Sequence, residues 1–445
     1  MNPYLGYEIA LLVVAAYGAV VYGFYRAGWI GPDRALTLLG PALMIKTKRG
    51  RSALERWARF RRFWTFAADV GIALAAVAMA GILLLLVVDA ILSFRLTAAS
   101  APPVTEALGL PGINPIIPIG YGILALVVGV VLHELAHGVV ARSQGIGVKT
   151  LGILWCVVPV GAFVEQDDVE MLAAPRRRRD RVAAAGVLAN FVLTVVFFVA
   201  LSLLVASSVA PNASGVGVSV VVSNSPAANA TIAPGDIITS INGTDTTDYA
   251  LFESSLSDTH PGQVVAVSYY SAATGENVHI NVTLAPSPTV AGRGFLGVAV
   301  SFLTPADLRT TLVWPLGSSA GPGMGAIDWL VLPLATLEPV GGSTAQFYHL
   351  TGPLAGVDPS TFWLVANTLY WLAWMNLLLG MSNALPLVPL DGGLLFRDFA
   401  ASIAARFRRG WTAAHLDEFG GRAVAASSLI VLLLLVWQFV VPRLL

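Results

Sequence analysis

The chain has 445 residues, of which 56% are hydrophobic and only 12% charged, and its mean hydropathy is +0.74. Soluble domains carry roughly 25% charged residues, so this composition indicates a membrane protein. The net charge is zero and no basic tract is interleaved with aromatic residues, which argues against nucleic-acid binding. The single cysteine, Cys156, excludes an intramolecular disulfide and a cysteine-rich zinc site.

Six segments are long and apolar enough to cross a bilayer, which predicts a polytopic α-helical membrane protein with about six transmembrane helices. They are residues 5–25, 66–92, 118–141, 183–208, 360–382 and 423–441. The first segment has no basic region before it, so we expect an uncleaved span and not a signal peptide.

Basic residues follow the first, third and fifth of these spans, at 46–62, 142–181 and 397–422. The positive-inside rule makes that side cytoplasmic and predicts a plasma-membrane protein with both termini outside. The segment 212–300, on the opposite side, has six acidic residues and one basic residue, a formal charge of about −5 (1 − 6). Its four glycosylation sequons, at Asn212, Asn229, Asn242 and Asn281, fit the same assignment.

The third span contains the sequence HELAH, with His133, Glu134 and His137. On a helix, HExxH sets two imidazoles one turn apart on one face, where they can bind zinc, and places a glutamate beside them as general base. An ionisable cluster is costly inside a membrane, so we expect it to be functional.

The segment 143–172 does not fit a span, because its apolar part, Ile146 to Ala162, lies in a stretch with four glycines and Pro159 between 145 and 161, too many for a transmembrane helix. Residues 151–160 are strand-like. Since non-helical backbone at membrane depth needs protein or water around it, we interpret the segment as a re-entrant hairpin beside the metal site. The alternative is a hydrophobic loop at the cytoplasmic interface.

Residues 211–300 contain short β-branched runs at 216–222, 237–241, 264–268 and 278–284, separated by turn residues. Ser225-Pro226-Ala227, Pro234-Gly235-Asp236 and Asn242-Gly243 give this part a resemblance to a PDZ domain. The resemblance implies a possible peptide ligand bound by strand addition; the alternative is a structural cap. Residues 301–358 lie outside or at the interface, and their apolar run Ile327 to Ala335 is either interfacial or a gate.

A zinc hydrolase typically uses three protein ligands, and HELAH supplies two. The other histidines, His260, His279, His349 and His415, lie in no span. Asp391 is the predicted third ligand, because it follows two prolines at the cytoplasmic end of the fifth span. It precedes Arg397 by six residues, as His137 precedes Arg142 by five, so both half-sites lie at comparable depth.

HELAH in a span, a PDZ-like insertion, and Asn383-x-x-Pro386-x-x-Pro389-x-Asp391-Gly392 resemble the site-2 protease family of intramembrane zinc metalloproteases, over residues 118–395. The resemblance implies one Zn²⁺ held by His133, His137 and Asp391, with Glu134 as general base and Asn383 near the scissile bond. It also implies transmembrane protein substrates in the bilayer and regulated intramembrane proteolysis. The family's Ala-Gly-Pro-x-x-Asn element lacks its proline here, at residues 185–190.

Two alternatives remain at this stage. A membrane-anchored zinc protease of another clan would take its third ligand from Glu165 or Glu170. A non-catalytic PDZ-containing scaffold or receptor would hold a structural metal, although such a site has no use for Glu134. Asn383 is alternatively a residue that caps a helix kink. Asn190 and Asn376 are expected to form interhelical hydrogen bonds.

The predicted organisation has five parts. Residues 1–117 carry two spans and a basic cytoplasmic loop. Residues 118–210 carry the HExxH span, the re-entrant segment and the next span. Residues 211–300 are the PDZ-like domain, and 301–358 the extracytoplasmic or interfacial segment. Residues 359–445 carry the span with the Asp-Gly motif, a cytoplasmic loop and the last span.

Overall fold

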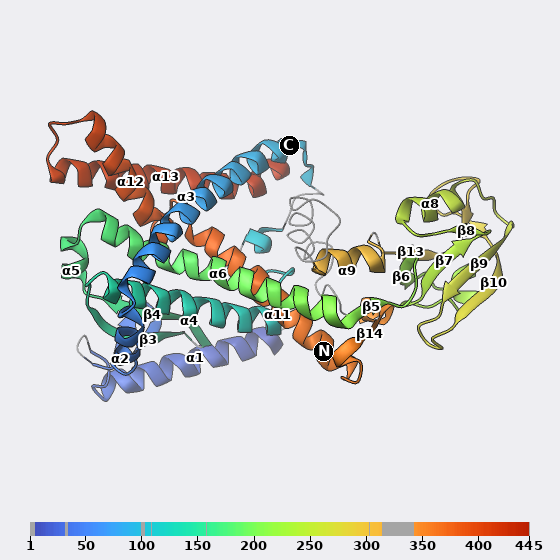
Figure 1. Cartoon of the computed structure of the whole chain (residues 1–445), viewed down its shortest axis with the longest axis horizontal. Helices are drawn as coiled ribbons and strands as arrows, with labels where there is room; N and C mark the ends of the chain where they lie inside the picture. The colour runs from blue at the N-terminus through green and yellow to red at the C-terminus, as the bar shows by residue number, and fades with distance from the viewer. Residues whose placement is uncertain are drawn as a thin grey trace. The chain divides into compact units, whose positions relative to one another are not determined.

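The computed structural model describes residues 5–31, 34–98, 103–107, 109–156, 158–301, 303–313 and 342–444 (Figure 1). By their contacts these residues form two compact units. The first unit comprises residues 1–115, 122–194 and 374–445, and the second comprises 116–121 and 195–373. The HExxH motif and the Asp-Gly motif both belong to the first unit.

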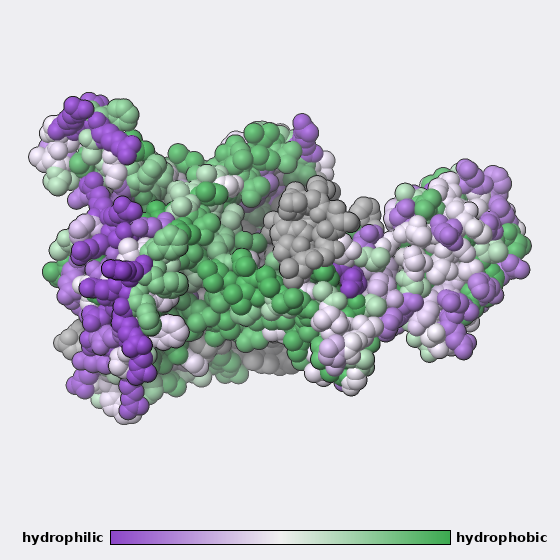
Figure 2. All heavy atoms as spheres, viewed as in Figure 1, coloured by the Kyte–Doolittle hydropathy of each residue, from purple (hydrophilic) through white to green (hydrophobic). Residues whose placement is uncertain are grey.

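The predicted spans are present as helices. Five helices are long and apolar enough to cross a membrane, and each coincides with a predicted span or extends beyond it: α3 (Arg61–Leu92), α4 (Ile119–Ser143), α6 (Arg176–Ser208), α11 (Pro359–Asn383) and α13 (Ala413–Leu444). Helix α1 (Leu5–Arg26) contributes a shorter apolar stretch, Leu11–Arg26, so a sixth span stays a prediction. Figure 2 shows an apolar surface over the long helices of the first unit and hydrophilic atoms gathered near α2 and α5.

Helices α3 and α6 begin with arginines before their apolar parts, because arginine is a good helix former that a hydropathy pattern does not register. Helix α6 starts at Arg176, directly after Pro175, and so includes the arginine block. There the guanidinium of Arg179 forms hydrogen bonds of 3.0–3.2 Å with the fully buried carboxylate of Asp398. This paired charge ties α6 to α12 (Asp391–Phe407).

The segment 143–172 forms the predicted hairpin, from β3 (Val148–Cys156) and β4 (Val158–Gln166). Its depth in a membrane stays a prediction. The predicted first cytoplasmic loop contains three elements that were not predicted from the sequence: β1 (Leu36–Leu39), β2 (Ala42–Thr47) and helix α2 (Arg51–Ala58). The four strands form one antiparallel sheet in the order β1-β2-β3-β4. Strand β2 is recognisable only from its partner β3, about 100 residues later.

Helix α11 ends at Asn383, as the two prolines predict, and Asp391 begins α12. A helix within the predicted cytoplasmic loop after Asp391 was not predicted from the sequence. Glycine is a poor helix former, so Gly392 and Gly393 hide the start of α12 from a sequence pattern. Close packing requires both glycines. A Cβ at position 392 would lie 2.3 Å from the carbonyl oxygen of Ala384, and a Cβ at position 393 would lie 2.7 Å from the carbonyl oxygen of Leu387.

In the second unit, the four strands predicted within 211–300 are all present. The elements of this β domain are β6 (Val216–Val221), α7 (Pro226–Asn229), β7 (Ile237–Ile241), β8 (Thr244–Asp245), α8 (Tyr249–Ser257), β9 (Val264–Tyr270), β10 (Asn277–Thr283), β11 (Ala285–Pro286), β12 (Gly294–Phe295) and β13 (Val298–Val300). The main sheet has the order β10-β9-β7-β6-β13, with β8 beside β7. Val216, Ile238 and Val265 are completely buried between this sheet and its helices.

Three further short elements of the second unit are β5 (Val209–Pro211), α9 (Pro305–Val313) and β14 (Tyr348–Leu350), with β5 paired to β14. Short 3-10 helices lie at Ser93–Arg95, Val104–Ala107, Gly342–Phe347 and Gly352–Leu354, and α5 is Asp168–Ala173. The predicted interfacial or gating run, Ile327 to Ala335, lies outside the described residues.

Candidate metal centre

The two histidines of HELAH face one point on the buried side of α4. His133 is 7% and His137 6% exposed, and their Nε2 atoms lie 3.1 Å apart. The spacing of four residues on a helix of 3.6 residues per turn produces this arrangement.

Asp391, at the start of α12, completes a triangle of donor atoms. Its Oδ2 lies 3.1 Å from Nε2 of His133 and 3.2 Å from Nε2 of His137. Donors bound to one zinc ion at about 2.0–2.1 Å in a tetrahedron lie about 3.3 Å apart, so the three separations fit such an ion. Among the described residues, these three form the histidine, cysteine and carboxylate group with metal-binding geometry.

The other nitrogen of each ring orients it. Nδ1 of His137 donates a hydrogen bond of 2.7 Å to the Val182 carbonyl, which can only accept. Nδ1 of His133 lies 3.2 Å from the Asn190 side-chain oxygen. With Nδ1 protonated, each neutral ring directs its Nε2 lone pair toward Asp391. Three lone-pair donors then converge on one point, and a cation is the group that stabilises them together.

Helix α6 provides the wall opposite these rings, and Figure 1 shows it beside α4. Val182, Gly186 and Asn190 are spaced by four residues, so they lie along one face of α6. A Cβ at Gly186 would lie 2.4 Å from the His133 ring and 2.5 Å from Nε2 of His137. The glycine therefore leaves the space that the donor atoms and an ion require.

The prediction that Asn190 forms an interhelical hydrogen bond is confirmed. Two contacts were not predicted from the sequence: the partner of Asn190 is the predicted metal ligand His133, and the Val182 carbonyl accepts a hydrogen bond from His137. The four-residue spacing of Val182, Gly186 and Asn190 matches that of His133 and His137. It could have predicted these contacts only if α4 and α6 had been known to be neighbours.

Glu134 points to the hairpin. Its Oε2 accepts a hydrogen bond of 3.2 Å from the backbone N–H of Val164 in β4. Asn383, the last residue of α11, is half-buried, and its side-chain amide donates to the Leu379 carbonyl at 3.0 Å. This contact matches the capping alternative, although an amide group has a second N–H and an oxygen to offer.

The alternative third ligands do not join the two histidines. Glu165 pairs with Lys46 at 3.3 Å, and Glu170 accepts a hydrogen bond from the Gly147 N–H. The remaining histidines have other partners: His260 lies against Gly292, His279 against Ser268, His349 against Asn212 and His415 against Thr412. The geometry thus supports Asp391 and gives no support to the other protease clan.

Comparison with known proteins identifies the family. The model of peptidase family M50 matches residues 121–416, a segment that includes HELAH and Asp391. The chain belongs to peptidase family M50, the site-2 protease family. As an M50 peptidase it is a zinc metalloendopeptidase in a membrane. The His133, His137 and Asp391 donor set fits the zinc ion that the family implies.

Individual relatives agree with this assignment. An uncharacterized protein of Methanocaldococcus jannaschii is 27% identical over 370 residues, covering 82% of this chain and 80% of its own. Zinc metalloprotease RasP of Shouchella clausii is 27% identical over 253 residues, covering 53% of this chain and 55% of its own. Metalloprotease MmpA of Caulobacter vibrioides is 24% identical over 389 residues, covering 71% of this chain and 93% of its own.

Replacing Gly186 with alanine is expected to remove zinc from the purified M50 peptidase. The added Cβ would overlap both imidazoles, so the rings must turn away from Asp391. Zinc per chain, measured by inductively coupled plasma mass spectrometry, should fall at least tenfold, a loss of about 1.4 kcal/mol or more in binding free energy. Gly81→Ala in α3 is the matched control, since nothing lies within 4 Å of its Cβ. Full zinc content in Gly186→Ala would show that the rings do not need this space.

Proposed function

We propose that this protein hydrolyses peptide bonds within or next to transmembrane segments of membrane-protein substrates, as in regulated intramembrane proteolysis. The observation that carries the proposal is the donor triangle on α4, a helix apolar enough to span a membrane, completed by Asp391. Buried ionisable groups in such a helix are expensive unless a metal compensates them. The place of the metal is therefore the place of reaction.

In this proposal His133, His137 and Asp391 hold the zinc ion. Zinc supplies a Lewis acid that polarises a peptide carbonyl and makes water more acidic. Glu134 removes a proton from the attacking water and delivers it to the leaving amine. The hydrogen bond from Val164 fixes the Glu134 carboxylate on the hairpin side of the site.

Strand β4 offers a way to hold the substrate. It is the edge strand of its sheet, paired with β3 on one side among the described strands. An edge strand presents free backbone N–H and C=O groups to an extended peptide. Since Val164 of β4 contacts Glu134, a peptide added to this edge would lie beside the proposed base. A transmembrane helix must unwind locally before its peptide bond can be attacked, and strand addition would stabilise the unwound segment.

Two substitutions separate catalysis from metal binding. Glu134→Gln should keep zinc and slow cleavage of a labelled transmembrane substrate in detergent by about 10³-fold, because an amide cannot accept the proton. Asp391→Ala should lose zinc as well as activity. If Glu134→Gln cleaves at the wild-type rate, Glu134 is not the base. If the wild-type protein holds zinc but cleaves none of several transmembrane substrates, the scaffold reading replaces the proposal.

We propose that Asn383 binds the substrate, and the same cleavage assay tests this role. Its second amide N–H would donate to the substrate backbone or to the developing oxyanion. Asn383→Ala should lower kcat/KM by about 10²-fold with zinc content unchanged. If instead it lowers only the thermal unfolding midpoint, capping of α11 is its whole contribution.

We also propose that the basic loops face the cytoplasm and that both termini and the β domain lie outside, on the charge distribution of the sequence. Cysteines introduced into a Cys156→Ala background test this with a membrane-impermeant maleimide on intact cells. Asn281→Cys should be labelled and Arg62→Cys should be labelled only after the membrane is permeabilised. The reverse pattern would invert the topology.

The β domain, which we propose to be a PDZ-like peptide-binding domain, has a cavity of about 160 Å³. Phe252 and Leu256 of α8 form one wall, and residues 293–298, leading into the edge strand β13, form the other. A helix beside an edge strand is an arrangement that accepts an extended peptide. We propose that an extracytoplasmic segment of the substrate occupies it.

Val290→Arg is expected to fill this cavity, because Val290 lines it and is 47% exposed. Cleavage of a substrate with an extracytoplasmic tail should slow severalfold, while cleavage of a tailless substrate should not change. Val264→Arg, on β9 and 58% exposed, is the matched control. Equal effects of the two variants on both substrates would favour the structural-cap alternative.

A further inference from the structure

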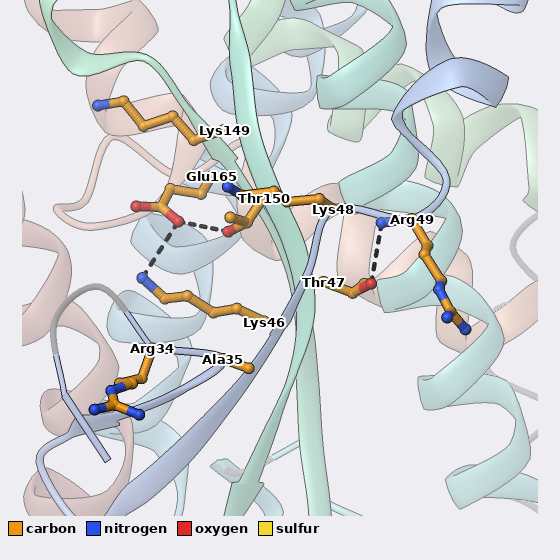
Figure 3. Close-up of a pocket in the computed structure, with 9 residues that line it drawn as sticks. All are labelled: Arg34, Ala35, Lys46, Thr47, Lys48, Arg49, Lys149, Thr150 and Glu165. Atoms are coloured by element: carbon orange, nitrogen blue, oxygen red, sulfur yellow. Dashed lines mark hydrogen bonds and ion pairs between the residues drawn. The ribbon is translucent and has the colours of Figure 1, made fainter. Parts of the chain in front are cut away.

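A second cavity, of about 740 Å³, lies in the first unit at one end of the β1–β4 sheet (Figure 3). Nine residues line it: Arg34, Ala35, Lys46, Thr47, Lys48, Arg49, Lys149, Thr150 and Glu165. Five are cationic and one is a carboxylate, which gives a formal charge of +4 (5 − 1). The three lysines are the only lysines in the whole chain. The zinc chemistry uses none of these residues.

Most of this positive charge has no counterpart. Lys46 pairs with Glu165 at 3.3 Å, and Lys149 pairs with Asp167 at 3.6 Å. Arg34, Lys48 and Arg49 have no ion pair among the described residues. Figure 3 shows the lysine side chains around Glu165, with Arg49 pointing away from them. Like charges held this close repel each other, and a bound anion would relieve the repulsion.

The single carboxylate of the cavity, Glu165, already has partners within the protein. The Thr150 hydroxyl donates to Glu165 at 2.5 Å, and this bond, together with Lys46, holds the pKa of the Glu165 carboxyl below its ordinary value. Glu165 therefore fixes Lys46 in place and leaves the other cations to an incoming ligand. Lysine ammonium groups and an arginine guanidinium together suit a phosphate, which offers several charged oxygens.

The sheet itself places the cavity at a boundary between apolar and basic surface. Ile45 pairs with Ile153, and these side chains are 40% and 47% exposed. Leu38 and Leu39 of β1 are also exposed, at 40% and 57%. Leu39 pairs with Ala42 at one end of the strands, and Lys46 of β2 and Lys149 of β3 lie toward the other end. In a membrane protein, such a change along a strand marks the transition from hydrocarbon to headgroups.

We propose that this cavity binds a phosphate-bearing anion at the membrane surface, and that the phosphate of an anionic phospholipid is its source. The exposed leucines and isoleucines on the apolar part of the sheet would contact the acyl chains. The alternative source of the same chemistry is a soluble phosphate compound, which would make no use of that apolar surface.

The test compares two double variants of the full-length protein. Arg34→Gln/Lys48→Gln removes two cavity cations that are exposed and form no ion pair. Arg56→Gln/Arg62→Gln removes the same charge from two exposed arginines nearby in the chain that do not line the cavity. Both variants should keep the wild-type unfolding midpoint, because none of the four residues forms an ion pair with another described residue. Neither touches the zinc ligands, so the binding result is independent of the proposed function.

Binding of short-chain phosphatidylglycerol, short-chain phosphatidylcholine and inorganic pyrophosphate is measured by native mass spectrometry and microscale thermophoresis. We expect the wild type to prefer phosphatidylglycerol, and Arg34→Gln/Lys48→Gln to weaken that binding about tenfold or more. The control variant should bind like the wild type. Equal weakening in both variants, or no preference for phosphatidylglycerol, would overturn the proposal. If the wild type binds pyrophosphate and not phosphatidylglycerol, and Arg34→Gln/Lys48→Gln weakens the pyrophosphate binding about tenfold, the ligand is a soluble phosphate compound and the lipid proposal is wrong.

Discussion

The Nε2 atoms of His133 and His137 and Oδ2 of Asp391 lie 3.1–3.2 Å from one another inside the first unit. The packing around them depends on keeping these three donor atoms together. Without a cation, two imidazole nitrogens and a carboxylate oxygen that face one another are electrostatically unfavourable. The Val182 carbonyl and Asn190 hold the rings in place, and Gly186 leaves their space empty. Gly392 lets α12 begin so close to the preceding turn that Asp391 reaches the same point. Each of these features costs stability or freedom, and a zinc ion bound by the three donors would offset them together.

The hairpin connects this centre with the rest of the sheet. Val164 and Glu165 are consecutive residues of β4, and they serve different neighbours. The backbone of Val164 contacts Glu134, while the side chain of Glu165 contacts Lys46 in β2. Because a strand moves as a unit, the position of the proposed base depends on the pairing of all four strands. The β1–β2 hairpin, built from the predicted first cytoplasmic loop, is therefore linked through β3 and β4 to the candidate site, although it lies far from HELAH in sequence.

The parts of the site that could be predicted from sequence are those with a local pattern. HELAH specifies a helical face by spacing alone, and the charges at Arg142 and Arg397 singled out Asp391 as its partner, which the distances to both histidines support. The element at 185–190 that contains Gly186 and Asn190 was noted in the sequence. The roles of these two residues depend on the neighbouring helix α4, and no local sequence pattern identifies that neighbour. Strands β1 and β2 were missed because β2 is defined by a partner about 100 residues away. Helix α12 was missed because its first turn contains two glycines that only its close packing explains.

The position of Asp391 shows why the two glycines after it matter for chemistry as well as for packing. A helix that begins at Asp391 leaves the backbone N–H groups of its first turn without helical partners, and these partial positive charges favour a carboxylate at that position. The same turn must lie against residues 384–388, which end α11, and any side chain at position 392 or 393 would push it outward. A shift of about 1 Å would take Asp391 out of the range in which one ion can contact all three donors. The Asp-Gly-Gly sequence thus combines the proposed third ligand, a helix start and the close approach that brings this carboxylate to the two histidines.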